Sequence, residues 1–187
     1  YLAKMEYVFE QLGVPKELVK LSLVESSFNL NAVSRVGATG VWQFMEASAR
    51  QFLMIDHRRG VDERLSPIKS TVAAAKLLKS NEKILGNWAF AITAYNAGFR
   101  GLLKIPRAQR EKADLEKIYA PCSHSSKLGF ASKNYYIEFL AMLYAGTYSE
   151  DFYGVPASIP SYPIKYQFIG SRKSPHKIAS EHGINLI

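Results

Sequence analysis

Residues 23 to 44 read LVESSFNLNAVSRVGATGVWQF, and this stretch decides the fold class that we assign to the chain. It starts at the end of an apolar helical pattern and continues into a loop rich in Asn, Ser and Gly. At about 100° per residue, Leu18, Leu21 and Glu25 fall within about 60° of one another on the helix. A lone carboxylate is therefore expected on the core side of that helix.

Glu25 has two interpretations. Burial disfavours the charged form of a carboxyl group and raises its pKa, which leaves a proton to donate near neutral pH and suits a general acid. The alternative is a Glu at a frayed helix end whose carboxylate reaches water or bonds Ser26. The following loop favours the acid, because its amides, hydroxyls, glycines and the aromatic rings of Trp42 and Phe44 suit sugar binding.

The composition limits the class of protein. A chain of 187 residues can form one domain with a sizeable core, alone or with a tail, and two full domains are not expected. Its apolar runs fall short of the ~18 residues of a membrane span, so none is expected. The single cysteine, Cys122, excludes an internal disulfide framework and a multi-cysteine zinc site. We expect neither a metal nor an organic cofactor.

The net charge of +8 makes an anionic partner worth considering: nucleic acid, a membrane surface or an acidic polymer such as a cell-wall glycan. The Lys and Arg residues are spread along the chain, and Arg58-Arg59 and Arg172-Lys173 are short pairs. A nucleic-acid-binding module would need a clustered basic face and an affinity that falls steeply with salt. We therefore interpret the charge as general surface charge and expect no nucleic-acid partner.

Helical periodicity dominates the chain and predicts a mainly α fold. Ser66 is expected to cap a long helix with Pro67 at its first position. Gly98 is expected to close another helix in a left-handed conformation. The predicted helices span about 2–12, 15–26, 42–53, 67–86, 88–97, 107–119 and 133–148, and a loop covers 28–41.

The character of the chain changes after Tyr148. Four of its eight prolines fall in the final 39 residues, which predicts an extended, Pro-rich tail. We therefore expect a helical catalytic domain at 1–148 and a C-terminal tail at 149–187.

Three ordered motifs resemble a known family: ES at Glu25-Ser26, SRVGATGVWQF from Ser34 to Phe44, and AYNAG at 94–98. In order and spacing they are similar to the motifs of the lytic transglycosylases of glycoside hydrolase family 23, which share a goose-type lysozyme (SLT) fold. VDERLSPIKSTVAAAKLL and NYYIEFLAML further resemble the membrane-bound type D branch. The resemblance covers about residues 10 to 148 and implies a lysozyme-like helical domain.

The resemblance implies that Glu25 is the catalytic acid/base at the bond between N-acetylmuramic acid and N-acetylglucosamine. It would protonate the glycosidic oxygen and then help the muramic 6-hydroxyl attack the anomeric carbon, giving a 1,6-anhydro product. The substrate's 2-acetamido group can replace a second catalytic carboxylate. Attack by water would instead make the protein a lysozyme in its products. Other acids in the sequence could still fold nearby, namely Glu46, Asp56, Asp62 and Glu63.

The resemblance also implies roles for other residues. Ser34 matches a position that contacts the muramic side of the substrate, Gln43 one that lines the cleft, and Asn96 a substrate-binding amide. Tyr95 matches the tyrosine that hydrogen-bonds the catalytic Glu, and Phe44 is expected to be part core and part cleft wall. Simpler roles stay open, because Ser34 and Asn96 could cap turns, Gln43 could sit on an exposed helix start, and the Tyr95 hydroxyl could find a backbone partner.

The chain also departs from the family pattern. Glu46 stands where relatives commonly have proline, and on a helix it would share a face with Gln43. One hypothesis is that Glu46 binds substrate and favours a deacetylated glycan; the alternative is a first-turn Glu stabilised by the helix dipole. Phe99-Arg100 replaces a frequent Glu-Gly pair. The final HKIASEHGINLI is similar to the start of a helix after the catalytic domain, or to the opening of a LysM-type glycan-binding repeat.

The expected partner is the glycan strand of peptidoglycan, bound by a monomer. The resemblance implies a periplasmic, secreted or other cell-envelope location. A wall-binding protein without activity is the remaining alternative, and it is disfavoured because Glu25 and Tyr95 are both present.

Overall fold

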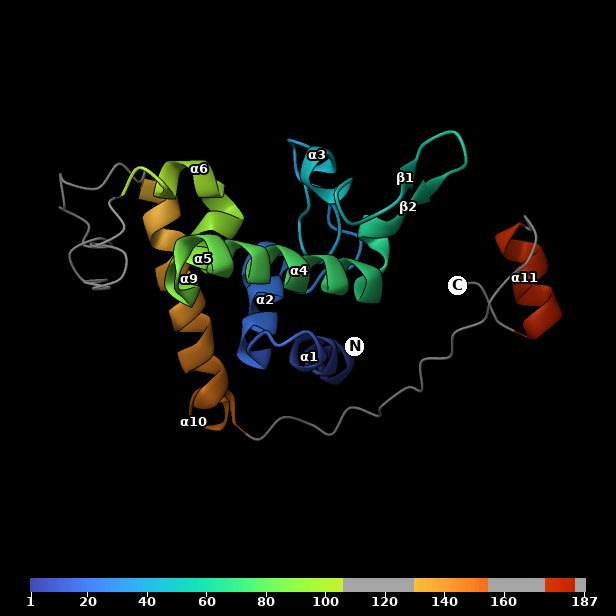
Figure 1. Ribbon diagram of the computed structural model, residues 1–187. Helices are drawn as coiled ribbons and strands as arrows, with labels where there is room; N and C mark the ends of the chain where they lie inside the picture. The colour runs from blue at the N-terminus through green and yellow to red at the C-terminus, as the bar shows by residue number, and fades with distance from the viewer. Residues whose placement is uncertain (106–129, 155–173, 184–187) are drawn as a thin grey trace. The chain divides into compact units, whose positions relative to one another are not determined.

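The computed structural model describes residues 1–105, 130–154 and 174–183. The chain divides into two compact units, Tyr1–Gly154 and Val155–Ile187. With η marking 3-10 helices, the described elements are α1 (Leu2–Gln11), η1 (Lys16–Lys20), α2 (Leu21–Ser26), α3 (Glu46–Ala49), β1 (Ile55–Asp56), β2 (Val61–Asp62), η2 (Glu63–Leu65), α4 (Pro67–Leu85), α5 (Trp88–Ala97), α6 (Phe99–Leu102), α9 (Phe130–Thr147), α10 (Ser149–Tyr153) and α11 (Pro175–His182). In the described residues of the first unit the regular elements are helices, apart from the antiparallel β1–β2 hairpin, which confirms the predicted mainly α class (Figure 1).

The two central helices start and end where local signals predict. α4 begins after Ser66, whose hydroxyl accepts a hydrogen bond from a first-turn N–H, and Pro67 occupies the first position. It ends at Gly86, which has the left-handed conformation. α5 has the predicted bounds, but Gly98 combines a φ of 73° with an extended ψ of 146°. The chain therefore leaves α5 without the left-handed helical turn that the sequence predicted.

The predicted helix at 15–26 is divided. It begins as the 3-10 helix η1 and continues as α2, and Leu18 and Leu21 are buried as expected. Ser27 follows with a φ of 50°, which ends α2 one residue after Glu25. The catalytic candidate thus lies at the last turn of a short helix, where the side chain can face the following loop.

The predicted helix at 42–53 is wrong at both ends, because α3 covers only Glu46–Ala49. Trp42 and Phe44 are both buried, at 0% and 3% exposure, and Gln43 between them has a φ of 46°. Burying two aromatic rings that are two residues apart requires a non-helical backbone, since a helix would turn them about 200° apart. Core packing therefore overrides the local helical signal here.

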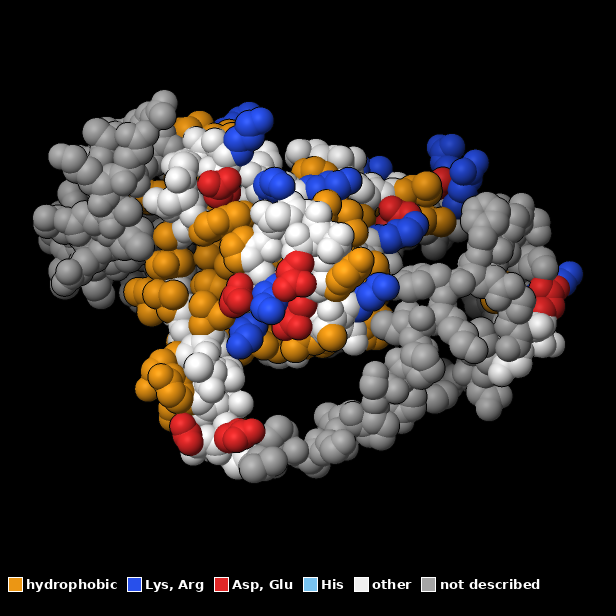
Figure 2. Space-filling model, turned by 60° about the horizontal axis from the view of Figure 1, so that its bottom comes forward, with side chains coloured by type: hydrophobic (Ala, Val, Ile, Leu, Met, Phe, Trp, Pro, Cys, Tyr) orange, Lys and Arg blue, Asp and Glu red, His pale blue; other side chains and the backbone are white. Residues whose placement is uncertain are grey.

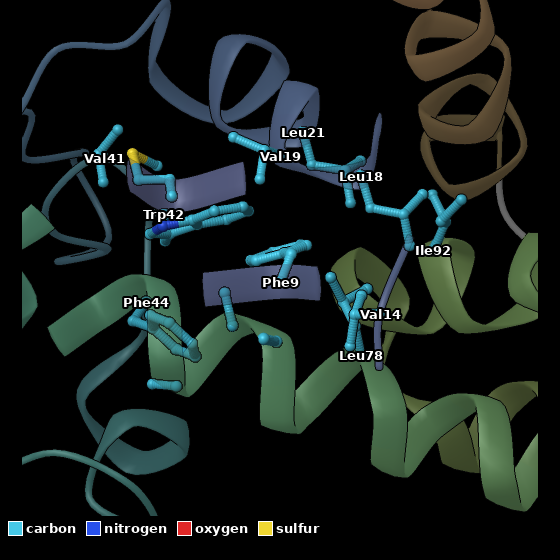
Figure 3. Packing of buried hydrophobic residues seen from close by; sticks show 14 of the residues in the cluster. Phe9, Val14, Leu18, Val19, Leu21, Val41, Trp42, Phe44, Leu78 and Ile92 are labelled. Atoms are coloured by element: carbon cyan, nitrogen blue, oxygen red, sulfur yellow. The ribbon is translucent and has the colours of Figure 1, made fainter. Parts of the chain in front are cut away.

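The core forms around an aromatic stack. The rings of Phe9 on α1 and Trp42 lie with their centroids 5.4 Å apart and nearly parallel, at 15° (Figure 3). The Trp42 indole N–H donates to the Thr71 hydroxyl of α4 at 2.9 Å. The loop before α3 is thereby fixed to both α1 and α4.

The segment after Tyr148 is not extended throughout. α9 agrees with the predicted helix at 133–148, and α10 follows it directly. α11 is the described part of the second unit, and the Ser174 hydroxyl caps it. The predicted helix at 107–119 lies outside the described residues. The domain boundary after Tyr148 stays a prediction.

The surface carries mixed charge. On the face seen in Figure 2, basic side chains gather over the β1–β2 hairpin, and acidic and basic side chains alternate elsewhere. At the α9–α10 junction, the ring of Tyr144 lies 4.6 Å from that of Tyr148 and 6.1 Å from that of Phe152, and all three side chains are exposed. In the described parts of the chain, no helix has the length and apolar character that a bilayer span requires.

Candidate active site

A pocket of about 600 Å³ opens beside Glu25. Its walls come from the loop between α2 and α3, from α3 and the turn after it, from one face of α4, and from the end of α5 with the residue that follows Gly98. Among the described residues that line it, Glu25 alone has an acidic or basic side chain. The predicted site residues that line the pocket are Glu25, Gln43, Phe44, Tyr95 and Asn96.

Glu25 is held in a form that can donate a proton. Its side chain is partly buried, and the Tyr135 hydroxyl on α9 donates to its Oε1 at 2.6 Å. Burial raises the pKa of Glu25 from 4.5 to about 7, the Tyr135 hydrogen bond opposes this rise, and the nearby charge of Glu138 adds to it. A carboxyl group with a pKa in this range is populated in both its protonated and its ionised form near neutral pH.

Tyr95 is not the hydrogen-bond partner of Glu25, which corrects the expectation from sequence. Its hydroxyl donates to the Trp42 carbonyl at 2.9 Å, and its ring packs edge-on against Phe44 at 5.9 Å. Burial and the nearby Glu25 raise the pKa of the Tyr95 hydroxyl well above 10, so that it keeps its proton. Tyr95 thus lines the pocket and fixes the backbone beside Gln43.

Tyr135 is the residue that sequence reasoning missed. It is only 4% exposed, and its pKa is also well above 10, first through burial and then through the charge of Glu25. It lies in the stretch NYYIEFLAML, which contains two adjacent tyrosines, Tyr135 and Tyr136. The available signal is helical phase, because Tyr135 and the buried Phe139 are four residues apart and share the inner face of α9.

Gln43 lines the pocket, and its side-chain amide oxygen is the polar atom that remains available to a ligand. Its side-chain N–H groups donate to the carbonyl oxygens of Gly40 at 2.8 Å and Ala32 at 3.2 Å. Both amide donors are thus occupied by the loop, which leaves the Gln43 oxygen as an acceptor for a ligand. Asn96 is exposed at the end of α5 and lines the same pocket.

Ser34 does not line the pocket. Its hydroxyl accepts the Ala38 N–H at 3.0 Å, and its own N–H donates to the Ala38 carbonyl at 2.9 Å. The residue therefore closes the turn before the pocket wall, which is the simpler role that the sequence left open.

Glu46 also lies outside the pocket lining, and it does not share a helical face with Gln43, because Gln43 precedes α3. Its Oε1 accepts from Arg50 Nη2 at 2.6 Å, and its Oε2 lies 3.1 Å from His57 Nε2. Hydrogen bonds from Arg50 and then from His57 lower the pKa of Glu46. Its charge is thus paired on the surface of α3.

The other acids considered from sequence are placed elsewhere as well. Asp62 pairs with Arg64 and Glu63 pairs with Lys69, while Asp56 faces Arg59 on the hairpin. Within the described ranges, no three His, Cys, Asp or Glu side chains come together as they would at a metal site. The geometry can therefore support proton donation by one carboxyl group in a cleft whose other described lining residues are uncharged.

Comparison with known proteins gives the family. A mainly helical domain whose pocket is lined by one partly buried carboxyl group is the arrangement expected of a lysozyme-like domain. Residues 10–118 match the family described as Transglycosylase SLT domain. The chain belongs to this family, which confirms the resemblance found in the motifs.

Two kinds of relatives are similar to the chain. Membrane-bound lytic murein transglycosylase D of Escherichia coli strain K12 is 31% identical over 101 residues, which cover 54% of this chain and 22% of that protein. A putative tributyltin chloride resistance protein of Alteromonas sp. strain M-1 is 32% identical over 115 residues, covering 61% of this chain and 55% of that protein. The chain thus spans about a fifth of the E. coli protein and about half of the Alteromonas protein.

Proposed function

We propose that this chain cleaves peptidoglycan as a lytic transglycosylase and that Glu25 is its general acid and base. The observation that carries the proposal is the partly buried Glu25, the one charged side chain among the described residues that line the pocket, with its pKa raised to about 7 and the Tyr135 hydroxyl donating to its Oε1. Membership of the Transglycosylase SLT domain family and the similarity to a lytic murein transglycosylase support the same reaction.

The reaction begins with protonated Glu25. The carboxyl proton passes to the oxygen that links N-acetylmuramic acid to N-acetylglucosamine, the bond from that oxygen to the anomeric carbon breaks, and the glucosamine side leaves as an alcohol. The Tyr135 hydroxyl stabilises the carboxylate that this step creates, because its hydrogen bond favours the ionised form.

The second step restores the acid. The Glu25 carboxylate accepts the proton of the muramic 6-hydroxyl while that oxygen bonds to the anomeric carbon, which yields a 1,6-anhydro end. Between the two steps the substrate's own acetamido group stabilises the positive centre. This route suits a pocket in which no second carboxylate lines the described walls.

Other pocket residues bind and position the substrate. Gln43 accepts a hydrogen bond from the glycan, Phe44 supplies an apolar wall, and exposed Asn96 offers its amide. Tyr95 positions the Trp42–Gln43 backbone through its bond to the Trp42 carbonyl. The protein acts as a monomer on glycan strands in the cell envelope.

The test is digestion of purified cell-wall sacculi followed by mass spectrometry of the fragments. The proposal predicts a loss of turbidity and fragments that end in 1,6-anhydromuramic acid. Fragments with reducing ends would assign hydrolysis by water at the same site. Intact sacculi would reject peptidoglycan cleavage.

A further inference from the structure

The segment 37–44, called the wall segment below, forms one side of the pocket. Ala38, Gln43 and Phe44 of this segment line the pocket, and these residues lie near its two ends. The segment contains no helix, and its internal pairing is one antiparallel bridge between Thr39 and Phe44 and a turn bond from Gln43 to Gly40. Contacts from other parts of the chain therefore also contribute to its shape.

The middle of the wall segment is fixed by two hydroxyl groups. Ser26 Oγ donates to the Val41 carbonyl at 3.0 Å, and Tyr95 donates to the Trp42 carbonyl at 2.9 Å. Neither contact reaches the ends of the segment, where the pocket-lining residues lie.

Both ends are bound by one side chain, Arg64 of η2. Its Nη1 donates to the carbonyl oxygens of Gly37 at 3.1 Å and of Phe44 at 3.2 Å. A single guanidinium group thus bridges the first and last residues of the wall segment, in addition to the two backbone hydrogen bonds that pair Thr39 with Phe44 inside it.

Burial and pairing with Asp62 orient the Arg64 guanidinium group toward the wall segment. Its side chain is buried, with 6% exposure, and its charge is balanced by Asp62, whose Oδ2 accepts from Arg64 Nη2 at 2.7 Å. The Asp62 Oδ1 also accepts the Arg64 Nε–H at 3.0 Å. The planar guanidinium group therefore donates hydrogen bonds to the Asp62 carboxylate through Nε and Nη2, and to two backbone carbonyl groups through Nη1.

The backbone of Arg64 also touches the wall segment. A Cβ atom added at Gly40, whose φ is 79°, would lie 2.1 Å from the Arg64 carbonyl oxygen. Only glycine fits such an approach, so the middle of the segment lies directly against η2.

We propose that Arg64 is a positioning residue that fixes the substrate-binding wall of the cleft, with Asp62 as its orienting partner. The inference rests on the proposed peptidoglycan-cleaving function. Arg64 does not itself line the pocket, and it acts on the glycan through the positions of Ala38, Gln43 and Phe44.

This role makes a specific kinetic prediction. The proton-donating pair Glu25–Tyr135 sits on α2 and α9, and Arg64 donates to neither element. Contacts made by the wall hold the substrate in the ground state and in the transition state alike, so loosening the wall raises KM and leaves kcat nearly unchanged. A residue needed only for folding would instead lower the amount of active protein, which lowers apparent kcat at constant KM.

The test variant is Arg64→Lys, which keeps the positive charge beside Asp62 but removes the fork that reaches both carbonyl groups. Release of muropeptides is measured against sacculus concentration, well below the melting temperature of each variant. We expect KM to rise on the order of tenfold with kcat within about twofold of wild type. An unchanged KM, or a loss confined to kcat, would overturn the inference.

Two further variants make the result decisive. Arg50→Lys is the matched control, because Arg50 also pairs with a carboxylate and donates to a carbonyl, that of Ile55, outside the pocket lining. Its KM should equal that of wild type. If Arg64→Lys does not fold, Asp62→Asn decides by the same criterion, since the partly exposed Asp62 keeps its shape as the amide but loses its charge.

The two levels of the proposal fail in different ways. If wild-type protein leaves sacculi intact, the proposed function is wrong. If wild type cleaves sacculi while Arg64→Lys and Asp62→Asn both keep the wild-type KM, only the role of Arg64 is wrong.

Discussion

The Tyr135 hydroxyl donates to Glu25 Oε1 at 2.6 Å, joining two side chains that are 110 positions apart in the sequence. This bond favours the ionised carboxylate, whereas burial favours the protonated carboxyl group. The pKa of about 7 is the balance of the two effects. A group with that pKa can give a proton and take one back near neutral pH, as the proposed reaction requires.

Removing the Tyr135 hydroxyl should raise the pKa of Glu25 further. In Tyr135→Phe, activity that needs protonated Glu25 should then persist to higher pH, so the alkaline limb of the pH profile of kcat/KM moves upward. The rate at the optimum should fall about tenfold, because the carboxylate formed after proton transfer loses its donor. A matched control is Tyr144→Phe on the exposed side of α9, which should leave the profile in place. A downward shift of the limb in Tyr135→Phe would contradict this balance.

Glu25 should also make stability depend on pH. Its pKa in the folded protein, about 7, is above its ordinary value of 4.5, so the folded state binds this proton more tightly than the unfolded state. The resulting stability is fully present below about pH 4.5 and is lost as the pH rises through about 7. Glu25→Gln removes this dependence and should exceed wild type in unfolding free energy at pH 8 by about 1 to 3 kcal/mol. Denaturant unfolding at pH 5 and pH 8 measures the difference, and equal pH slopes in both proteins would refute it.

Substitution of two asparagines should change the free energy of unfolding in opposite directions. Asn81 is 3% exposed, and among the described residues the one hydrogen bond of its side chain is a long contact of 3.4 Å to the Ala91 carbonyl. Asn81→Leu should therefore stabilise the fold by about 1 kcal/mol. Asn87 caps α5 by accepting the Phe90 N–H at 2.9 Å, so Asn87→Ala should cost about 1 kcal/mol. Thermal unfolding of both variants checks the signs, and a destabilised Asn81→Leu would mean that the amide is better satisfied than its contact indicates.

Glu46 is expected to have no influence on the acetylation state of the preferred glycan. Its carboxylate is paired with Arg50 and His57 and does not line the pocket. Glu46→Ala should cleave acetylated and deacetylated peptidoglycan in the same ratio as wild type. A ratio that changes would return Glu46 to the substrate site as the sequence suggested.

Local sequence signals predict the elements that depend on neighbouring residues. The start of α4 follows from Ser66 and Pro67, and the bounds of α5 follow from the apolar run between Gly86 and Gly98. The position of Glu25 in a pocket follows from its place on the apolar face of α2 together with the family motifs.

Contacts between segments that are distant in the sequence could not be predicted from the sequence. The non-helical path through Trp42 depends on the stack against Phe9, and the partner of Glu25 is chosen by how α9 packs. Tyr95 and Tyr135 are both close enough to Glu25 to feel its charge, and only the folded structure shows which hydroxyl bonds it. The burial of Arg64 runs against the usual exposure of arginine, so composition gives no sign of it.

The most direct measurement is the action of Glu25→Gln on purified sacculi, with Glu138→Gln as the matched loss of an exposed carboxylate on α9. The amide keeps the shape of the glutamate and cannot deliver a proton, so lysis and anhydro fragments should fall below about a thousandth of wild type in Glu25→Gln and persist in Glu138→Gln. A Glu25→Gln protein that releases the same fragments at a rate close to wild type would contradict the account.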